Sequence, residues 1–379
     1  MIHPFVLSCR KRMHRPSSEQ EAIGVMGGPV SEQGITTETI GRAVHITRRG
    51  GPEVLAVREV RVPPPGVGEA LVRVEAAGVA FGDIALREGL GGGSRSSVPG
   101  YDAAGTVASV GANVEGLAVG DKVAVWTSGS GGYATHVVVP AWAAVPYPGH
   151  LGPHAVVSLV LNYLTAWQLL SRTAVVADGS TILVHSAAGG IGSALLQLAA
   201  LRGMRVIGTA SAGKAELVER LGAVPIDYRG QDVPARVREL APDGVDAVFD
   251  ALGGRSWRQA LPLLRPGGHL IAYGMSGAFR GGRRSLPKLL GNVLRDPRTA
   301  YLTYFTRSIG VSGYRSDVMV GTHHDWFRQD MGSLIGLLAA GSIAPVVHRS
   351  YPLEQAGQAQ AELGAGRATG KITLAIPQP

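Results

Sequence analysis

Short hydrophobic runs separated by glycine and proline characterise the chain between positions 42 and 140. Many of these runs are rich in valine and alanine, and the triplet Pro63-Pro64-Pro65 separates two of them. Short strands divided by glycine and proline predict a compact, partly open β-barrel. The expected strands are residues 43–47, 53–59, 69–76, 100–110, 121–126 and 134–139.

The pattern changes near position 156. Residues 156–170 are largely apolar and contain no glycine or proline, as expected of a buried helix. Strand-like and helix-like segments then alternate, which predicts a doubly wound parallel sheet because parallel strands need crossover helices. The expected strands are 180–185, 205–210, 224–227, 245–250 and 268–273, with helices at 192–201, 215–221, 233–240 and 256–264.

The two ends of this pattern are less regular. Residues 1–40 lack a sustained hydrophobic period, so we expect a mostly disordered leader. Within residues 277–308, the stretch 279–285 is rich in glycine and arginine, and 286–295 is a helix candidate. The expected elements of the C-terminal part are strands at 309–313 and 371–376 and helices at 325–340, closed by Gly341, and 354–363.

Composition places the chain among globular proteins. Its 379 residues exceed what one hydrophobic core usually supports, so we expect two domains. No apolar run approaches about 18 residues, and we expect no membrane-spanning helix. The single cysteine, Cys9, excludes a disulfide within the chain and a cysteine-built zinc site, and we expect a cytoplasmic protein.

The net charge of +8 narrows the partners only slightly. Basic residues gather in two runs, at 10–15 and 280–288. Such runs are usually solvated, although they could also attract an anionic cofactor. Because no nucleic-acid-binding motif is present, we expect a small-molecule partner and no nucleic acid.

The segment ILVHSAAGGIGSALLQL at 182–198 carries the strongest functional signal. A strand leads directly into a glycine turn and a helix, whose first N–H groups and dipole can bind a pyrophosphate. A side chain at Gly189 or Gly190 would obstruct the phosphates, and Gly192 allows the helix to pack on the strand. Ser186 occupies the first position of the usual glycine series. A glycine cluster can also mark only a tight turn, but the βαβ context favours a dinucleotide site.

The end of the next strand favours NADPH over NADH. NAD sites usually have an acid near this point, whereas the nearest acid here is Glu216, inside the following helix. Ser211 and Lys214 can instead bind a 2′-phosphate. The alternative interpretation is that Lys214 is an ordinary exposed lysine at a helix start.

Three segments resemble the zinc-free quinone oxidoreductases of the medium-chain dehydrogenase/reductase superfamily: LNYLTAWQLL at 161–170, HSAAGGIG at 185–192 and DALGG at 250–254. The resemblance extends from about residue 41 to residue 376. It implies an α/β fold with a cofactor cleft between two domains, and a homodimer through the strand at 309–313. The implied domains are a GroES-like barrel domain of residues 41–165 and 309–379 and a Rossmann domain of residues 166–308.

The same resemblance implies the cofactor contacts. Thr165 would lie near the nicotinamide, and Lys371 matches a C-terminal contact of the family. The other implied contacts are Ser186, Gly189, Gly190, Ile191 and Gly192 at the pyrophosphate, Ser211, Lys214 and Tyr228 at the 2′-phosphate, and Leu252, Gly253, Tyr273, Gly274 and Ser276 beside the ribose and nicotinamide.

The chain also departs from its relatives. Ala80 stands where family members often have an asparagine that could orient cofactor or substrate, and residues 277–308 are longer and more basic than in the family. Zinc-dependent members carry Gly-His-Glu where this chain has Gly100-Tyr101-Asp102. The adjacent His323 and His324 would not share a helix face. We therefore expect no zinc.

Without a Lewis acid, conjugated acceptors suit hydride transfer, because the protein then mainly orients the substrate over the nicotinamide. Tyr101 is the candidate proton donor or hydrogen-bond partner, although it could equally be a packing residue. Asp83, Asp102 and His185 are interpreted as structural. The leading hypothesis is NADPH-dependent reduction of a quinone or an α,β-unsaturated carbonyl compound. The alternatives are a dinucleotide-binding adaptor with little redox activity and a tailoring enzyme of secondary metabolism.

Overall fold

The computed structural model describes residues 38–90, 98–174, 176–280, 283–284 and 297–377. All of them fall in one unit, residues 35–379. The helix candidate at 286–295 and almost all of the expected leader lie outside the described residues.

A mostly antiparallel sheet forms the part of the fold expected to be a barrel. The strand β17 (Lys371–Ala375) returns to it and pairs with its longest strand, so segments from both halves of the sequence build this sheet. Two further strands, β1 (Thr39–Ile46) and β2 (Leu55–Val62), pair only with each other. The sheet order is β16 (Val347–Pro352), β17 (Lys371–Ala375), β3 (Glu69–Val79), β4 (Asp102–Val110), β5 (Lys122–Trp126) and β7 (Ala144–Pro146), with β6 (His136–Pro140) also on β3.

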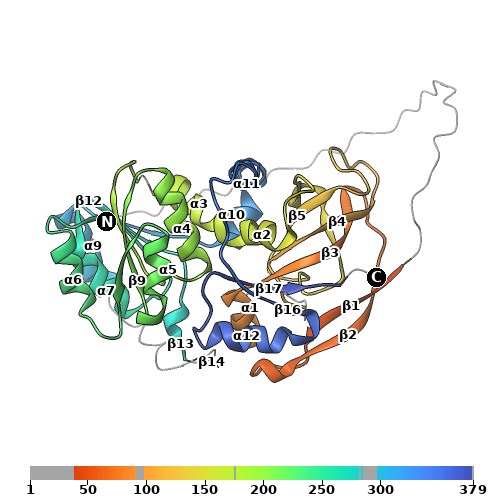
Figure 1. Cartoon of the computed structure of the whole chain (residues 1–379), viewed down its shortest axis with the longest axis horizontal. Helices are drawn as coiled ribbons and strands as arrows, with labels where there is room; N and C mark the ends of the chain where they lie inside the picture. Colours follow the sequence, from red (N-terminus) through yellow and green to blue (C-terminus); the bar gives the residue numbers. More distant parts are fainter. Residues whose placement is uncertain (1–37, 91–97, 175, 281–282, 285–296, 378–379) are drawn as a thin grey trace, which may run out of the picture. The chain divides into compact units, whose positions relative to one another are not determined.

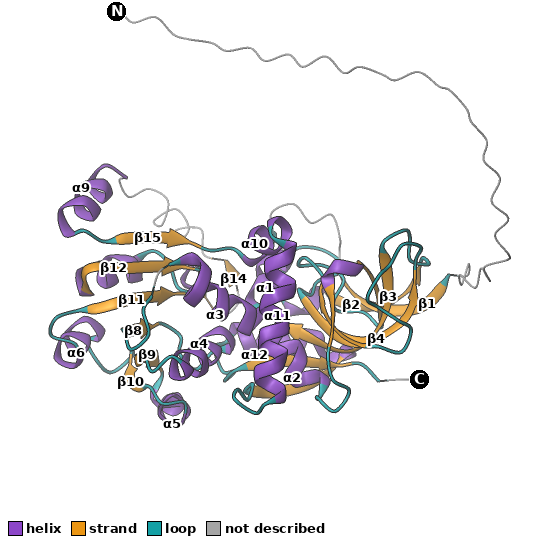
Figure 2. Ribbon diagram, turned by 90° about the horizontal axis from the view of Figure 1, so that it is seen from above, coloured by secondary structure: helices purple, strands orange, loops and turns teal. Residues whose placement is uncertain are grey.

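The second large sheet is parallel and six-stranded, as the alternating pattern predicts. Its order corresponds to 3-2-1-4-5-6 along the chain, so the order reverses between β8 and β11, where α/β proteins bind ligands. Figure 2 shows β11, β12 and β15 side by side. The strands in order are β10 (Val224–Asp227), β9 (Arg205–Ala210), β8 (Thr181–Val184), β11 (Val245–Asp250), β12 (Leu264–Ala272) and β15 (Gly310–Gly313).

Both faces of this sheet are buried. In β8, Ile182 and Val184 belong to one hydrophobic cluster, and Leu183 between them belongs to another. This alternation explains why the strand is uniformly apolar in sequence. Figure 1 shows the covering helices in green. They are α4 (Gly190–Leu201), α5 (Ala215–Arg220), α6 (Val233–Leu240) and α7 (Arg255–Ala260).

Several element boundaries differ from the sequence prediction. The helix expected at 256–264 ends at Ala260, and a 3-10 turn containing Pro262 follows, because proline cannot continue the helical hydrogen bonding. The strand expected at 53–59 begins two residues later, after a turn that starts at Pro52. The elements that were not predicted include α1 (Phe81–Arg87), β7, α9 (Pro297–Arg307), α10 (Ser316–Thr322) and β16.

The domain boundaries stay a prediction. The strand expected at 309–313 is β15, and it pairs with β12 at the edge of the parallel sheet. By sheet membership, the return of the chain to the antiparallel sheet therefore starts with β16, after residue 313.

A continuous helical segment links the two sheets in sequence. The helix expected at 156–170 is confirmed, but it contains two π-helical turns, which are wider than an α-helix. All five residues of the first π turn are buried. In order, the segment consists of α2 (Pro153–Ser158), η3 (Leu159–Tyr163), α3 (Leu164–Gln168) and η4 (Leu169–Thr173).

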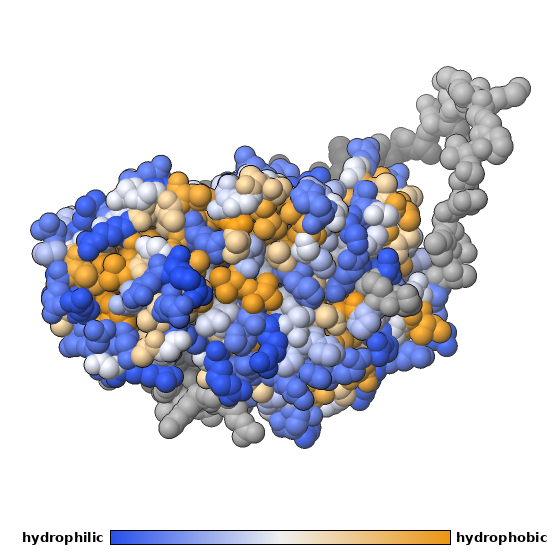
Figure 3. Space-filling view, viewed as in Figure 1, coloured by the Kyte–Doolittle hydropathy of each residue, from blue (hydrophilic) through white to orange (hydrophobic). Residues whose placement is uncertain are grey.

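The surface carries both hydrophobic and hydrophilic side chains. On the face drawn in Figure 3, small hydrophobic areas alternate with hydrophilic ones. Within the described ranges, no helix has both the length and the apolar character needed to cross a membrane.

A buried carboxylate fastens α11 (His324–Ala339) to the segment 153–173. Asp330 is 1% exposed and accepts hydrogen bonds from Gln168 at 2.8 Å and Trp167 at 3.1 Å. Arg172 pairs with the same carboxylate at 2.6 Å. The charge is therefore compensated from several sides, as a buried ion requires.

We expect Asp330→Ala to lower the free energy of unfolding by about 3–5 kcal/mol, because it leaves the Arg172 guanidinium without its buried partner. The control is Asp178→Ala, which removes a largely exposed ion pair and should cost less than about 1 kcal/mol. Urea unfolding of both variants measures the difference. Equal losses in the two variants would contradict the assigned role of Asp330.

Candidate functional site

The turn between β8 and α4 has the geometry of an anion site. The Gly189 N–H donates to the Ser186 carbonyl at 2.9 Å, and the Ser193 N–H donates to Gly189 at 2.8 Å. The amides of residues 190–192 come before the first intrahelical bond, so they have no acceptor in the helix. Together with the helix dipole they favour an anion.

Close packing explains the residues of this turn. A Cβ atom at Gly192 would lie 2.2 Å from the Ser186 carbonyl oxygen, so a side chain there would collide with the backbone of the turn. A Cβ atom at Gly190 would lie 2.1 Å from Nδ2 of Asn162, so this glycine also serves packing against the helical segment. Ser186 has a φ of 57°, in the left-handed region that glycine adopts most readily.

The strand ends beside the turn carry a buried hydrogen-bond network. Asp250, at the end of β11, accepts from the N–H groups of Leu252 and Gly253, both at 2.7 Å. His185 contacts Thr209 Oγ1 at 3.1 Å, and its Nε2 lies 3.9 Å from Asp250. Burial lowers the pKa of His185, and the charge of Asp250 opposes this shift. A neutral histidine that joins β8 to β9 fits the structural interpretation.

The remaining expected contacts beside the ribose and nicotinamide gather at the ends of β11 and β12. The Ser276 N–H and hydroxyl both donate to the Ala251 carbonyl, at 3.0 and 2.9 Å. A Cβ atom at Gly274 would lie 2.7 Å from the same oxygen, so the two loops are in close contact. Tyr273 follows β12 directly, and its N–H donates to the backbone carbonyl oxygen of Asp250. Thr165 is buried on α3.

Lys214 is not an ordinary exposed lysine. Its Nζ donates to the carbonyl oxygens of Gly366 at 2.7 Å and Ala368 at 2.5 Å. Burial lowers its pKa, and the positive charge of Arg229 contributes. The guanidinium of Arg229 lies 5.6 Å from the ring centroid of Tyr228. Arg229 was not among the residues predicted from the sequence, although its place directly after Tyr228 was a usable signal.

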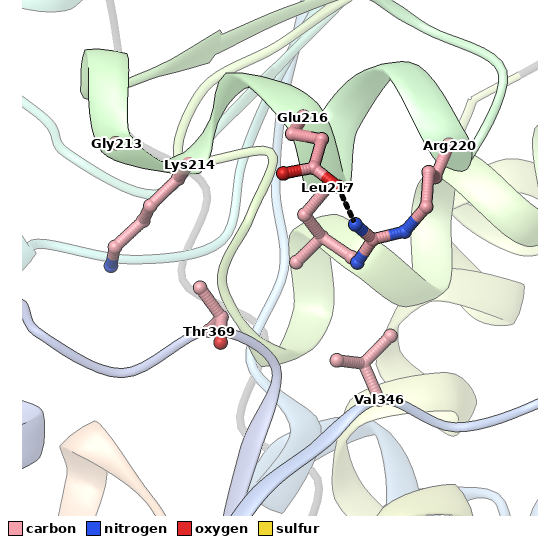
Figure 4. A pocket seen from close by; sticks show the side chains of 7 residues that line it. All are labelled: Gly213, Lys214, Glu216, Leu217, Arg220, Val346 and Thr369. Carbon is pink, nitrogen blue, oxygen red and sulfur yellow. Dashed lines mark hydrogen bonds and ion pairs between the residues drawn. The ribbon is translucent and has the colours of Figure 1, made fainter.

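A cavity of about 200 Å³ lies beside Lys214. Figure 4 shows the Lys214 amine pointing away from the ion pair between Glu216 and Arg220, whose atoms are 2.7 Å apart. The nearest acid in the sequence is therefore paired with a neighbouring arginine. The cavity is lined by Gly213, Lys214, Glu216, Leu217, Arg220, Val346 and Thr369.

The C-terminal segment approaches the turn at residues 186–192, the expected phosphate turn. The Gly370 N–H donates to the Ala188 carbonyl at 2.8 Å, and Gly370 pairs with Gly189 as a short parallel bridge. The next side chain, Lys371, is 2% exposed and pairs with Asp102 at 2.6 Å. The structure thus brings Lys371 near the expected site but directs its amine to a carboxylate of the antiparallel sheet.

Tyr101 is a partly exposed side chain over two glycines. Cβ atoms at Gly82 and Gly129 would lie 2.5 and 3.0 Å from its ring. Burial, and secondarily the charge of Asp83, raises the pKa of Tyr101 to about 12. The phenol therefore stays protonated at neutral pH and can donate a hydrogen bond.

Asp83 has no exposed surface, and its charge acts on Tyr101. Its carboxylate accepts from the N–H groups of Ala80 at 2.8 Å and Gly100 at 2.9 Å, and from the Tyr133 hydroxyl at 2.9 Å. These bonds join α1 (Phe81–Arg87) to the loop that carries Tyr101. The structural interpretation of Asp83 fits this arrangement.

The two adjacent histidines stack on tryptophans. The ring of His324 lies 3.6 Å from that of Trp142, and His323 lies 4.0 Å from Trp326. Across the described part of the chain, no three histidine, cysteine, aspartate or glutamate residues are placed to hold a metal ion. The expectation of a zinc-free site stays a prediction.

Comparison with known proteins identifies the two parts of the fold. Residues 66–149 match the alcohol dehydrogenase GroES-like domain, and residues 221–374 match the domain described as zinc-binding dehydrogenase. Together with the 3-2-1-4-5-6 sheet, these matches confirm the expected α/β fold with a GroES-like and a Rossmann-type part. The protein is a medium-chain dehydrogenase/reductase.

The relatives narrow the class to a family. The rat quinone oxidoreductase is 31% identical over 351 residues, which are 90% of this chain and 99% of the relative. The rat synaptic vesicle membrane protein VAT-1 homolog is 31% identical over 344 residues, 89% of this chain and 84% of the relative. The crystal structure of Escherichia coli quinone oxidoreductase complexed with NADPH has a TM-score of 0.78 at 28% identity, covering 88% and 99% of the two chains. The chain belongs to the quinone oxidoreductase family, as the sequence resemblance predicts.

The buried Asp83 makes the stability of the protein depend on pH. Burial raises the pKa of Asp83 from 3.8 to about 7, hydrogen bonds from Ala80 and Tyr133 oppose the shift, and the charge of Asp102 adds to it. A raised pKa means that the folded protein holds a proton that the unfolded chain releases. We therefore expect the Asp83 contribution to stability to be lost as pH rises from about 4 through 7, by at most about 1.4 kcal/mol per pH unit.

Urea unfolding at pH 5, 6, 7 and 8 measures this loss, and Asp83→Asn should flatten the pH dependence relative to the unaltered protein. Asp178→Asn, on the surface, should leave the dependence unchanged. If Asp83→Asn shows the same pH slope as the unaltered chain, another group carries the titration.

Proposed function

We propose that the protein reduces a quinone or an α,β-unsaturated carbonyl compound with NADPH. The observation that carries the proposal is an anion-binding helix terminus at the reversal point of the parallel sheet, next to a strand end with two cations and no free acid. Membership in the quinone oxidoreductase family supports the reaction class. The NADPH complex of the Escherichia coli relative supports the cofactor.

The residues of the turn fit a pyrophosphate. The amides of residues 190–192 lack helical acceptors. A Cβ atom at Gly189 would meet only the Ser186 carbonyl oxygen, at 3.2 Å, so the space beside this residue is open to a ligand. Leu252 and Gly253, whose N–H groups donate to Asp250, would line the ribose and nicotinamide side. Tyr273, Gly274 and Ser276 would line the same side. NADPH, when bound, supplies the hydride.

The cations near the end of β9 fit the 2′-phosphate. Lys214 and Arg229 are close enough for their charges to interact, and like charges in one place are stabilised by an anion. Ser211 and the half-exposed Tyr228 supply hydroxyl groups beside them. In this arrangement Lys214 and Arg229 select the phosphorylated cofactor, because NADH offers no partner for their charges.

Tyr101 fits the acceptor side. Its protonated phenol donates a hydrogen bond to the oxygen that becomes negative as hydride adds to the conjugated system. The buried network of Asp83 and Tyr133 holds the loop of Tyr101 in place. Tyr101 therefore stabilises the enolate or hydroquinone anion, and solvent completes the protonation.

The homodimer is likewise a proposal. β15 is an edge strand of the parallel sheet, with its partner β12 on one side. On the neighbouring helix α9, Leu302 and Phe305 are 61% and 70% exposed. An edge strand next to exposed apolar side chains suits pairing with a second copy of the chain.

Substitution of the two cations tests the choice of cofactor. We expect Lys214→Met and Arg229→Met each to weaken NADPH binding by about tenfold and to leave NADH binding unchanged, because each removes one charge-assisted contact to the 2′-phosphate. Arg220→Met is the matched control, since Arg220 lies across the cavity in its own ion pair. Fluorescence titration with both nucleotides measures the effect. Equal loss of NADH and NADPH affinity would refute the assignment.

The reaction is tested by oxidation of NADPH at 340 nm with p-benzoquinone, phenanthrenequinone and 3-buten-2-one. We expect turnover with at least one acceptor, and a fall in kcat of about 10–100-fold in Tyr101→Phe, since the variant lacks the hydroxyl donor. Tyr147→Phe is the control, because Tyr147 is buried in the barrel part and its hydroxyl has no hydrogen-bond partner among the described residues. Tight NADPH binding without turnover on any acceptor would instead support the adaptor alternative.

A further inference from the structure

A buried ion pair connects the antiparallel sheet to the phosphate turn. Lys371 begins β17, Asp102 begins β4, and their charged atoms are 2.6 Å apart with side-chain exposures of 2% and 0%. Position 78 on the intervening strand β3 is closed to any side chain. A Cβ atom at Gly78 would lie 2.4 Å from the Asp102 oxygens and from Cε of Lys371.

Each member of the pair depends on the other. The second oxygen of Asp102 is buried and has no hydrogen-bond partner among the described residues, so Lys371 is the main compensation of this carboxylate. Removal of either charge leaves the other buried and unpaired, which is far less favourable than keeping or replacing both. The carboxylate of Asp102 therefore fixes the position of the Lys371 amine.

Gly370, the residue before Lys371, contacts the turn at residues 186–192, so the position of Lys371 also fixes the backbone beside this turn. Gly370 donates its N–H to Ala188 at 2.8 Å and bridges Gly189. Its φ is 69°, and a Cβ atom there would lie 2.1 Å from the Val346 carbonyl oxygen, so the chain has little freedom at this point. The Lys371 N–H also donates to Val346, at 2.8 Å.

We propose that Lys371 is a positioning residue. Its ion pair with Asp102 places Gly370 against the Ala188–Gly189 backbone and so sets the conformation of the phosphate turn, without contact between the lysine and the cofactor. The inference rests on the proposed cofactor site, and it replaces the direct contact that the family resemblance implies for Lys371.

The two roles of Lys371 make opposite predictions for paired substitutions. As a positioning pair, Lys371→Met and Asp102→Leu each weaken binding of NADPH and NADH alike, by about tenfold, since the turn serves both nucleotides. The double variant restores affinity to within about threefold of the unaltered protein, because two apolar side chains can replace a buried ion pair. As a direct contact, Lys371→Met is not rescued by the second substitution.

A conservative variant tests the proposal even if the two single variants fail to fold. Asp102→Glu keeps both charges but moves the lysine by one methylene group, and we expect weaker binding of both nucleotides together with faster amide exchange at residues 187–193. Arg220→Met, which removes an exposed ion pair, is the matched control, with no change in the binding of either nucleotide or in exchange at these residues. Unchanged exchange at 187–193 in Asp102→Glu, or an unrescued double variant that is folded by its thermal melt, would overturn the proposal.

The outcome separates this inference from the proposed function. If the unaltered protein binds neither nucleotide, the proposed function fails, and amide exchange at 187–193 still reports whether the ion pair positions the turn. If NADPH binds and turns over but the Asp102 and Lys371 variants behave independently, the function stands and the positioning role falls.

Discussion

The close packing of the turn at residues 186–192 is the constraint on which the candidate site depends. The turn is confined on one side by Asn162 and on another by the backbone of Gly370, and a side chain at Gly190 or Gly192 would collide with its surroundings. A loop held in this way presents its amides in a preset arrangement, so an anion binds without first ordering the backbone. The cofactor proposal and the role of Lys371 both follow from this rigidity.

Local sequence predicted the features that depend on neighbours in the chain. The apolar runs of β8 and β11 and the glycines at 189–192 show directly in the residues, because buried parallel strands and tight turns restrict residue type. The carboxylate of Asp83 could be seen, but its partners Gly100 and Tyr133 could not, since they come from 17 and 50 residues away. Long-range pairing of this kind has no periodic signature.

The lysines show the same limit from another side. Lys214 was predicted as a cofactor contact from its charge and its place after β9, and Lys371 from the family resemblance. The structure gives Lys214 two carbonyl partners and Lys371 a buried carboxylate, all distant in sequence. A basic residue near a site can therefore be part of the scaffold, as Lys371 is, or keep a third N–H donor for an anion, as Lys214 does, and the sequence does not distinguish the two.

The π-helical turn η3 has a consequence for how this family can vary in length. A π turn holds one more residue than the α-helical turn it replaces, so loss of one residue within 159–163 would leave a regular helix. Because the turn would then close with one residue fewer, the helical segments on either side would keep roughly their present phase, and the outward bulge of the backbone at 159–163 would disappear. Asn162 would lose the position that the wide turn gives it, and the π turn therefore determines how closely this helical segment packs against Gly190.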